Sequence, residues 1–516
     1  MKKSHLTYIK NILLPCFVYP AITGVSTGVI IFLFKLAVSR VVPFSAQLYS
    51  AARESIAYLP LLVLGAAALA LLSASILKLA PDCKGGGIPT SITLLRGLSD
   101  FSWIKSILLL FPSAIITYLG GVPLGTEGPA VQMGTAAGRG TVRIFAKKHL
   151  AWDRYIMTSG ASAGFAAATG APLTGMIFAF EEAHGRLNSM LFMSSAVSAL
   201  VSTAVIRFLC PLAGISPVLF HLDIDVSMPL KNVWICGLIG LFCAAVAGVF
   251  TRIYSKVHSL SSRFVSSLPM AVKVGFVFVL TALSGYFCRE ITGSGDHIIE
   301  ELFEGHVNPS LLILLLCVRG IILIVANNIG ITGGLFVPNL CFGAIIGALC
   351  GKAVISLGLL PEEYYIVCVI TGISAFLAAC SKTPLMALAF CIEALNGTAN
   401  LIPVAVGVTV AYMAVEIFAI HDFTDIVIDS KLKKAYHGKT KETVDITMTV
   451  REGSFAEGKQ VRDILWPPKC TVLSIRKQPS THHHSHTGIS AGDELELHFE
   501  TYDREETTRI LESIVH

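Results

Sequence analysis

The stretch GTEGPAVQMG, residues 125–134, places one carboxylate between glycines at the start of a predicted helix. Pro129 follows Gly128, and proline is favoured in the first turn of a helix, where its missing N–H would be unpaired anyway. The open N–H groups and the positive end of the helix dipole then point toward Glu127, which is the geometry that binds anions. The sequence therefore predicts that Glu127 occupies an anion site. The alternative is an acidic N-cap that faces water.

The composition of the whole chain favours the anion site. Of the 516 residues, 53% are hydrophobic and 14% are charged, which is too apolar for an ordinary soluble protein. Nearly uncharged runs of roughly transmembrane length recur, among them 58–77, 233–250 and 401–420. We therefore expect an all-α polytopic membrane protein. The net charge of +5 gives no case for nucleic-acid binding.

The second half of the chain repeats the first weakly but in register. The pattern at Ser159-Gly160 returns at Thr371-Gly372, and Pro172-Leu173 returns as Pro384-Leu385 at the same offset. The glycine and proline breaks around 85–87 and 127–129 also have counterparts, at 293–295 and 336–338. Duplicated transporter folds place broken helices and a substrate site at the interface between the halves. The repeat therefore predicts a transmembrane domain over 1–432, with halves at about 10–210 and 230–432.

Three motifs carry a family resemblance. GGGIP (85–89), GTEGP (125–129) and GGLFVP (333–338), in that order and spacing, resemble the ion-pathway motifs of the CLC family of chloride channels and chloride/proton antiporters. The resemblance covers about residues 10–432. It implies two inverted halves with broken helices, a homodimer, and one anion pathway in each subunit. Anions would be held by helix N-termini and backbone amides near the middle of the membrane.

The resemblance also implies roles for single residues. Glu127 matches the gating glutamate, and Glu182, in APLTGMIFAFEE (171–182), matches the internal proton-transfer glutamate of the antiporters. Taken without the resemblance, the pair Glu181–Glu182 is equally consistent with carboxylates that face water at the membrane surface. The residues expected to bind the anion are Gly86, Gly87, Ile88, Gly128, Leu335, Phe336 and Val337.

A gating glutamate and an internal glutamate together favour chloride/proton exchange. A deprotonated Glu127 would fill an anion site, and protonation would neutralise the carboxylate and release it. Glu182 would carry the proton to the other membrane face, so that the two ion movements are linked. We expect neither an enzyme nor a potassium channel, because the chain has no HExxH, GxSxG or TVGYG-like motif.

Two departures from the family pattern support an alternative, a passive or partly uncoupled anion channel, with fluoride or nitrate among the candidate anions. Chloride-selective members usually carry Ser where this chain has Gly86, and often a Tyr where it has Thr424. Both hydroxyl donors to the anion would then be missing, and a hydrogen bond to a charged partner is worth about 1.5–3 kcal/mol. Thr126 stands where an Arg is frequent, which removes a positive charge.

The end of the chain differs in composition, because 26 of the 73 charged residues lie in the last 86 positions. We expect a basic linker at 433–441 on the cytoplasmic side of the inner membrane, where Lys and Arg accumulate. Strand and helix patterns over 442–516, with a short helix expected in GKQVRDIL (458–465), predict a small α/β domain. Residues 453–467 and 488–499 resemble the RCK C-terminal (TrkA-C-like) domain, which implies regulation by an unknown small ligand.

The sequence gives no reason to expect a metal or another cofactor, so chloride is the only ligand expected in the pathway. The clustered histidines lie in a predicted loop without a Cys or carboxylate partner, which favours a polar loop over a metal site. They are His482, His483, His484 and His486.

Overall fold

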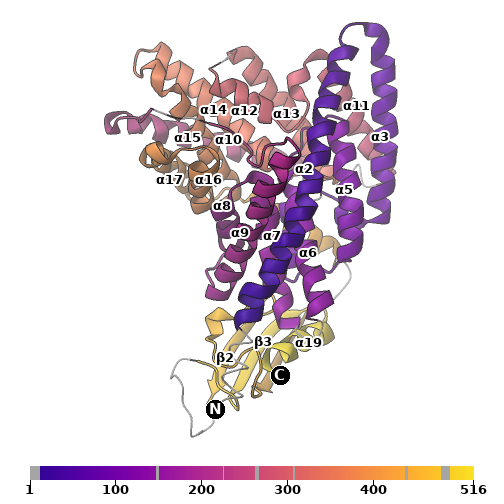
Figure 1. The fold of residues 1–516 in the computed structure, drawn as a ribbon, viewed down its shortest axis with the longest axis vertical. Helices are drawn as coiled ribbons and strands as arrows, with labels where there is room; N and C mark the ends of the chain where they lie inside the picture. Colours follow the sequence, from indigo (N-terminus) through magenta and orange to yellow (C-terminus); the bar gives the residue numbers. More distant parts are fainter. Residues whose placement is uncertain are drawn as a thin grey trace.

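The computed structural model describes residues 12–85, 87–146, 150–222, 224, 226–261, 267–305, 308–435, 440–477 and 488–516. Gly86 and the four clustered histidines lie outside these residues. The chain forms a large helical body, and the small sheet of the C-terminal domain lies against one end of it (Figure 1).

The first half of the helical body begins at η1 and ends with α9. Its elements are η1 (Leu14–Val18), α2 (Tyr19–Ala52), η2 (Ile56–Tyr58), α3 (Leu59–Leu79), η3 (Pro81–Cys83), α4 (Ile88–Leu95), α5 (Trp103–Leu119), α6 (Glu127–Phe145), η4 (Leu150–Trp152), α7 (Asp153–Thr169), α8 (Pro172–Phe178), η5 (Ala179–Ala183) and α9 (Ser189–Leu212).

The second half begins at η6 and ends with α18. Its elements are η6 (Leu230–Asn232), α10 (Val233–Leu260), α11 (Met270–Phe287), η8 (Arg289–Ile291), α12 (Asp296–Phe303), α13 (Pro309–Ile329), α14 (Phe336–Ser356), η9 (Glu362–Tyr364), α15 (Tyr365–Ser381), α16 (Pro384–Ala394), η10 (Thr398–Asn400), α17 (Leu401–Ile417) and α18 (Phe423–Ala435).

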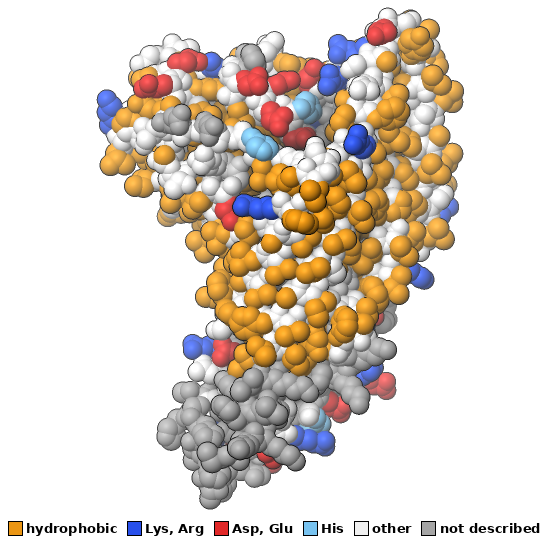
Figure 2. Space-filling model, viewed as in Figure 1, with side chains coloured by type: hydrophobic (Ala, Val, Ile, Leu, Met, Phe, Trp, Pro, Cys, Tyr) orange, Lys and Arg blue, Asp and Glu red, His pale blue; other side chains and the backbone are white. Residues whose placement is uncertain are grey.

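The helical body has the composition and surface of a membrane protein. Within the described residues, nine helices are long and apolar enough to cross a bilayer. Figure 2 shows apolar side chains over the middle of one face, with charged side chains gathered mainly toward its two ends. Other helices are shorter than a span, such as α4 and α8 with 8 and 7 residues. The predicted polytopic fold with interrupted helices is confirmed.

Matching glycine contacts relate the two halves. Gly134 of α6 lies against Gly160 of α7 so closely that a Cβ on either residue would overlap the carbonyl of the other. Gly343 of α14 and Gly372 of α15 make the same contact. Gly160 and Gly372 are the pair that aligns in the sequence repeat. Small residues permit this close packing of helices in lipid, where apolar burial between helices supplies little driving force.

The C-terminal domain is a three-stranded antiparallel sheet with one helix. The strands are β1 (Glu442–Thr449), β2 (Cys470–Arg476) and β3 (Glu494–Thr501), in the order β1-β3-β2, and α19 (Arg504–Val515) follows. The side chains of β3 alternate between buried and half-buried, as a strand with one face on a core requires. The predicted α/β domain is therefore present.

One detail of the prediction for this region is wrong. The stretch GKQVRDIL contains a single 3₁₀ turn, η11 (Val461–Asp463), where a short helix was expected. Gln460 and Ile464 on either side are extended, and Pro467 and Pro468 soon follow, so the turn cannot lengthen into a helix. α18 continues to Ala435 and so includes the first three residues of 433–441, whose role as a linker stays a prediction.

The C-terminal domain is fastened to the helical body by hydrogen bonds at the start of α7. The Tyr155 hydroxyl donates to the Asp463 carbonyl at 3.0 Å and accepts from the Leu465 N–H at 2.9 Å. The Arg154 guanidinium donates to the Leu465 and Trp466 carbonyls at 3.1 and 2.8 Å. Apolar side chains of both parts form one buried cluster around Tyr155. The two parts are therefore held together by both polar and apolar contacts.

We predict that Tyr155→Phe loosens this attachment, because it leaves the buried Leu465 N–H without its acceptor. An unpaired buried donor costs about 1–3 kcal/mol. In the detergent-solubilised protein, the amide of Leu465 should exchange with deuterium faster, and protease should release residues 440–516 more readily. Tyr286→Phe on α11, away from the interface, is the matched control. Unchanged exchange at Leu465 would contradict the role given to the hydroxyl.

Candidate functional site

The site is built where three glycine backbones meet. A Cβ placed on Gly128 would lie 2.7 Å from the Gly334 Cα and 2.9 Å from the Gly87 Cα, distances that real Cβ atoms do not show. These glycines stand at the starts of α6, α14 and α4. Three helices therefore begin at one place, and their N-terminal N–H groups and positive dipole ends converge there.

A two-residue bridge joins the starts of α6 and α14. The Gly125 N–H donates to the Gly334 carbonyl and the Gly334 N–H donates to the Gly125 carbonyl, each at 2.7 Å. The buried Tyr118 hydroxyl also donates to the Gly125 carbonyl, at 2.9 Å. Backbone hydrogen bonds between residues 209 positions apart therefore hold together the turns that precede α6 and α14. This fixes the orientation of the N–H groups at the starts of both helices.

Glu127 is the first residue of α6, and it is fully buried. The Thr126 hydroxyl donates to Glu127 Oε1 at 2.9 Å, whereas Oε2 has no hydrogen-bond partner among the described residues. Oε2 lies in space left by Gly125, where a Cβ would be 2.7 Å from it. The water-facing N-cap considered above is therefore wrong. The carboxylate sits inside the protein at a helix N-terminus, which favours negative charge.

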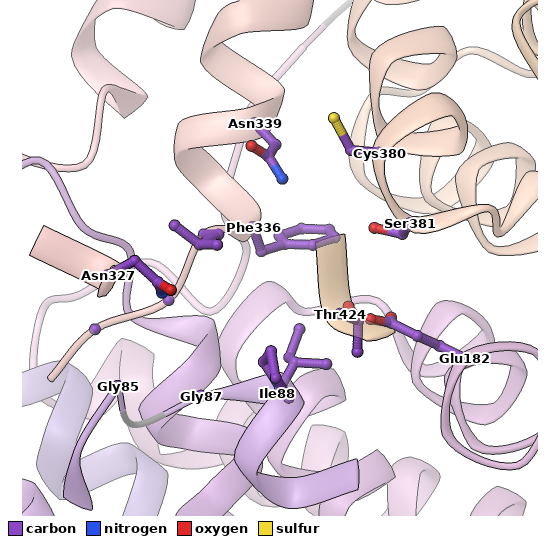
Figure 3. A pocket seen from close by; sticks show the side chains of 14 residues that line it. Gly85, Gly87, Ile88, Glu182, Asn327, Phe336, Asn339, Cys380, Ser381 and Thr424 are labelled. Atoms are coloured by element: carbon purple, nitrogen blue, oxygen red, sulfur yellow. The ribbon is translucent and has the colours of Figure 1, made fainter. Parts of the chain in front are cut away.

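A cavity of about 40 Å³ lies beside the glycine contact (Figure 3). This volume can hold a small anion or a few water molecules. Its wall includes the segment Gly333–Phe336, together with Gly85, Gly87, Ile88, Pro89, Glu182, Asn327, Asn339, Cys380, Ser381 and Thr424. The cavity thus joins the first and third motifs to Glu182.

Glu182 lies in the π-helical turn η5 and is 7% exposed. Figure 3 shows its carboxylate beside Thr424 at one end of the cavity. The Arg96 guanidinium, at the end of α4, donates to the Ala183 carbonyl at 2.9 Å and to the Glu182 carbonyl at 3.2 Å. The end of the helix that begins at the anion motif therefore also fixes the turn that carries Glu182.

The neighbouring Glu181 has a different environment from Glu182. Its two oxygens accept the Leu385 and Met386 N–H groups at the start of α16, at 2.9 and 2.6 Å. Glu393 of α16 does the same for α8, accepting the Leu173 and Thr174 N–H groups. Each half therefore caps a helix of the other half. The suggestion that both members of the pair face water is wrong for Glu182.

The structure brings most of the predicted anion-binding residues together. Gly87, Ile88, Leu335 and Phe336 line the cavity, and so does Thr424. Val337 is buried outside the cavity wall. Glu127 and Gly128 do not line it either, but Gly128 packs on Gly87 and Gly334 of the wall, so the cavity ends close to Glu127. The expectation for Gly86 lies outside the described residues.

The sequence reasoning did not identify two asparagines, Asn327 and Asn339, that line the cavity. A signal for both was present, because polar side chains within apolar helices of spanning length mark functional sites. Asn327 lies near the end of α13, and Asn339 lies in the first turn of α14. Neither residue belongs to one of the quoted motifs, so the motifs alone do not identify them.

Comparison with known proteins decides the family. Residues 65–416 match the family model described as voltage gated chloride channel, which covers most of the chain. The chain belongs to this family, the CLC family. The family model ends before the C-terminal domain, so the resemblance of residues 442–516 to the RCK C-terminal domain stays a prediction.

Members of the CLC family in bacteria are similar to this chain over most of its helical body. The H(+)/Cl(-) exchange transporter ClcA of Vibrio vulnificus (strain YJ016) is 29% identical over 344 residues, 64% of this chain and 70% of that protein. ClcA of Salmonella arizonae is 26% identical over 395 residues, covering 75% and 82%. The crystal structure of a slow cyanobacterial Cl⁻/H⁺ antiporter superposes with a TM-score of 0.74 at 25% identity, over 81% of this chain and 98% of that chain.

We predict that Gly128→Ala disrupts the site, because the added methyl group would overlap two backbones that cannot move independently. Overpacking of this kind costs about 1–3 kcal/mol. The detergent-solubilised variant should unfold at a lower temperature than the wild type. Gly275→Ala on α11 is the control, since its Cβ would meet nothing within 4 Å and alanine favours a helix. Equal melting temperatures for Gly128→Ala and wild type would show that the contact is looser than described.

Proposed function

We propose that this protein exchanges chloride for protons across a membrane. The observation that carries the proposal is the fully buried Glu127, with an unpartnered carboxylate oxygen, at the convergence of three helix N-termini. A cavity leads from this point to a second buried carboxylate, Glu182. The exchange activity named for the ClcA relatives and for the cyanobacterial antiporter supports the same function.

In the proposed mechanism, the Glu127 carboxylate and the transported anion compete for one electropositive place. The ionised carboxylate is held beside the N–H groups at the helix starts, and its negative charge excludes an anion from that place. Protonation removes the charge, so the side chain is no longer held there and an anion can take its place. The proton reaches the other membrane face by way of Glu182. Each anion step then requires a proton step.

A second candidate function is a passive or partly uncoupled anion pathway. Thr424 lines the cavity, and the family resemblance puts it where many members have a Tyr, so the larger side chain of those members is missing there. An anion that moves past Glu127 without proton transfer would uncouple exchange. A reversal potential set by the anion gradient alone, whatever the pH gradient, would select this candidate.

We expect Glu127→Gln to abolish proton movement while anion flux persists, because the amide keeps the shape of the carboxylate and cannot carry the proton. The measurement uses full-length protein in liposomes with a chloride gradient, recording chloride efflux and internal pH together. Wild type should drive protons against their gradient. In the variant, position 127 can no longer take up a proton. The change in internal pH should therefore disappear, while chloride efflux remains.

Glu181→Gln is the matched control for this experiment. Glu181 is adjacent to Glu182, but its oxygens accept backbone N–H groups of α16, and a glutamine oxygen can keep one of these bonds. Proton movement should therefore survive in Glu181→Gln. If Glu127→Gln still pumped protons, Glu127 would not be the gate. If the wild type moved no anion, the proposed function itself would fail.

We also propose the setting in which exchange takes place. The family resemblance supports a homodimer with one pathway in each subunit, in the inner membrane. The basic composition of residues 431–441 supports a cytoplasmic location for the C-terminal domain. That domain would act as a regulatory module for a small ligand, and its hydrogen bonds to Arg154 and Tyr155 give it a direct mechanical link to the helical body.

A further inference from the structure

Asn339 lines the cavity and turns its amide nitrogen toward it (Figure 3). The residue lies in the first turn of α14, three positions after Phe336, and is 7% exposed. Its backbone N–H donates to the Leu335 carbonyl at 2.9 Å, but its side-chain Oδ1 has no hydrogen-bond partner within the described part of the chain. Figure 3 shows the amide nitrogen directed toward the Phe336 ring and the space shared with Ser381. The unpartnered Oδ1 is an acceptor and needs a donor such as water, whereas the amide nitrogen is the atom that can donate to an anion.

Asn327 offers a second amide, and its orientation is fixed by a neighbour. The Tyr254 hydroxyl donates to Asn327 Oδ1 at 3.0 Å, which leaves the NH₂ group as the part of the side chain available to the cavity. The adjacent Asn328 makes a clear contrast. Its Nδ2 donates to the Ile324 carbonyl at 2.9 Å, its Oδ1 is 2.7 Å from His258 Nδ1, and it does not line the cavity. Of the two residues, Asn327 is the one whose NH₂ group can reach the cavity.

Not every backbone N–H group at a helix start beside the cavity is free to bind an anion. The backbone N–H of Thr424, at the start of α18, already donates to Asp422 Oδ1 at 3.0 Å. Thr424 also brings a short hydroxyl where many CLC proteins have a Tyr. Among the described residues, α18 therefore contributes the Thr424 hydroxyl to the wall, whereas α13 and α14 contribute two amides.

We propose that the NH₂ groups of Asn339 and Asn327 are side-chain ligands of the transported anion in this cavity. Tyr254 is a positioning residue that orients Asn327. This inference rests on the proposed function, and it deepens it by naming side chains that set affinity and selectivity. Carboxamide N–H groups are neutral donors, so they bind a small monovalent anion without the strong hold of a Lys or Arg. Two such groups add neutral side-chain donors to a wall that also holds the Ser381 and Thr424 hydroxyls.

The test measures chloride binding by calorimetry with the detergent-solubilised full chain, and chloride flux in liposomes. Wild type, Asn339→Ala, Asn339→Leu and Tyr254→Phe are compared, with Asn328→Ala as the matched control. We expect the chloride dissociation constant to rise about tenfold or more in both Asn339 variants, since a hydrogen bond to a charged group is lost. Tyr254→Phe should raise it less and change the order of preference among chloride, bromide and nitrate. Asn328→Ala should bind chloride as the wild type does.

The outcomes separate this inference from the proposed function. If wild type binds and transports chloride but both Asn339 variants bind it equally well, the ligand role is wrong and the proposed function stands. If Asn328→Ala weakens binding as much as Asn339→Ala, the loss comes from helix packing and the inference is overturned. Should Asn339→Leu not fold, Asn339→Ala decides the question, because alanine adds no volume. A wild type without chloride flux would overturn the proposed function itself.

Discussion

The contact of three glycine backbones is the constraint on which the rest of the structure depends. Gly87, Gly128 and Gly334 approach so closely that no side chain fits between them. Each lies at or just before the start of a helix, so the contact brings three sets of free N–H groups to one point. The positive potential needed to hold an anion is thus made from backbone, without a Lys or Arg in the pathway wall among the described residues.

This arrangement explains how a carboxylate can be buried in the middle of an apolar chain. A charged group inside a membrane costs about 2.5–3.5 kcal/mol or more on insertion scales. The start of α6 offsets that cost for Glu127 through its dipole, and the Thr126 hydroxyl adds one hydrogen bond. The same features would stabilise a free anion in the same place. A site that accepts either a side chain or an ion is what a proton-controlled gate requires.

Helix starts and strands could be predicted from the sequence, because each depends on residues that are close together in the chain. Glycine and proline placed the start of α6 at Glu127, and alternation of apolar residues placed the three strands of the C-terminal domain. The bridge between Gly125 and Gly334 could not be predicted from either segment alone, since it joins residues 209 positions apart. The same holds for the attachment of Asp463 to Tyr155. Asn339 was missed because one amide in an apolar helix fits no motif.

The most direct measurement of the central claim is anomalous diffraction from crystals grown in bromide, for the wild type and for Glu127→Gln. The account predicts that the variant binds bromide at the start of α6, in the position that the Glu127 carboxylate takes in the wild type, within hydrogen-bond distance of the backbone N–H groups. The wild type with an ionised Glu127 should lack this peak. A bromide peak at the same place beside an unmoved, ionised carboxylate would contradict the competition between side chain and anion.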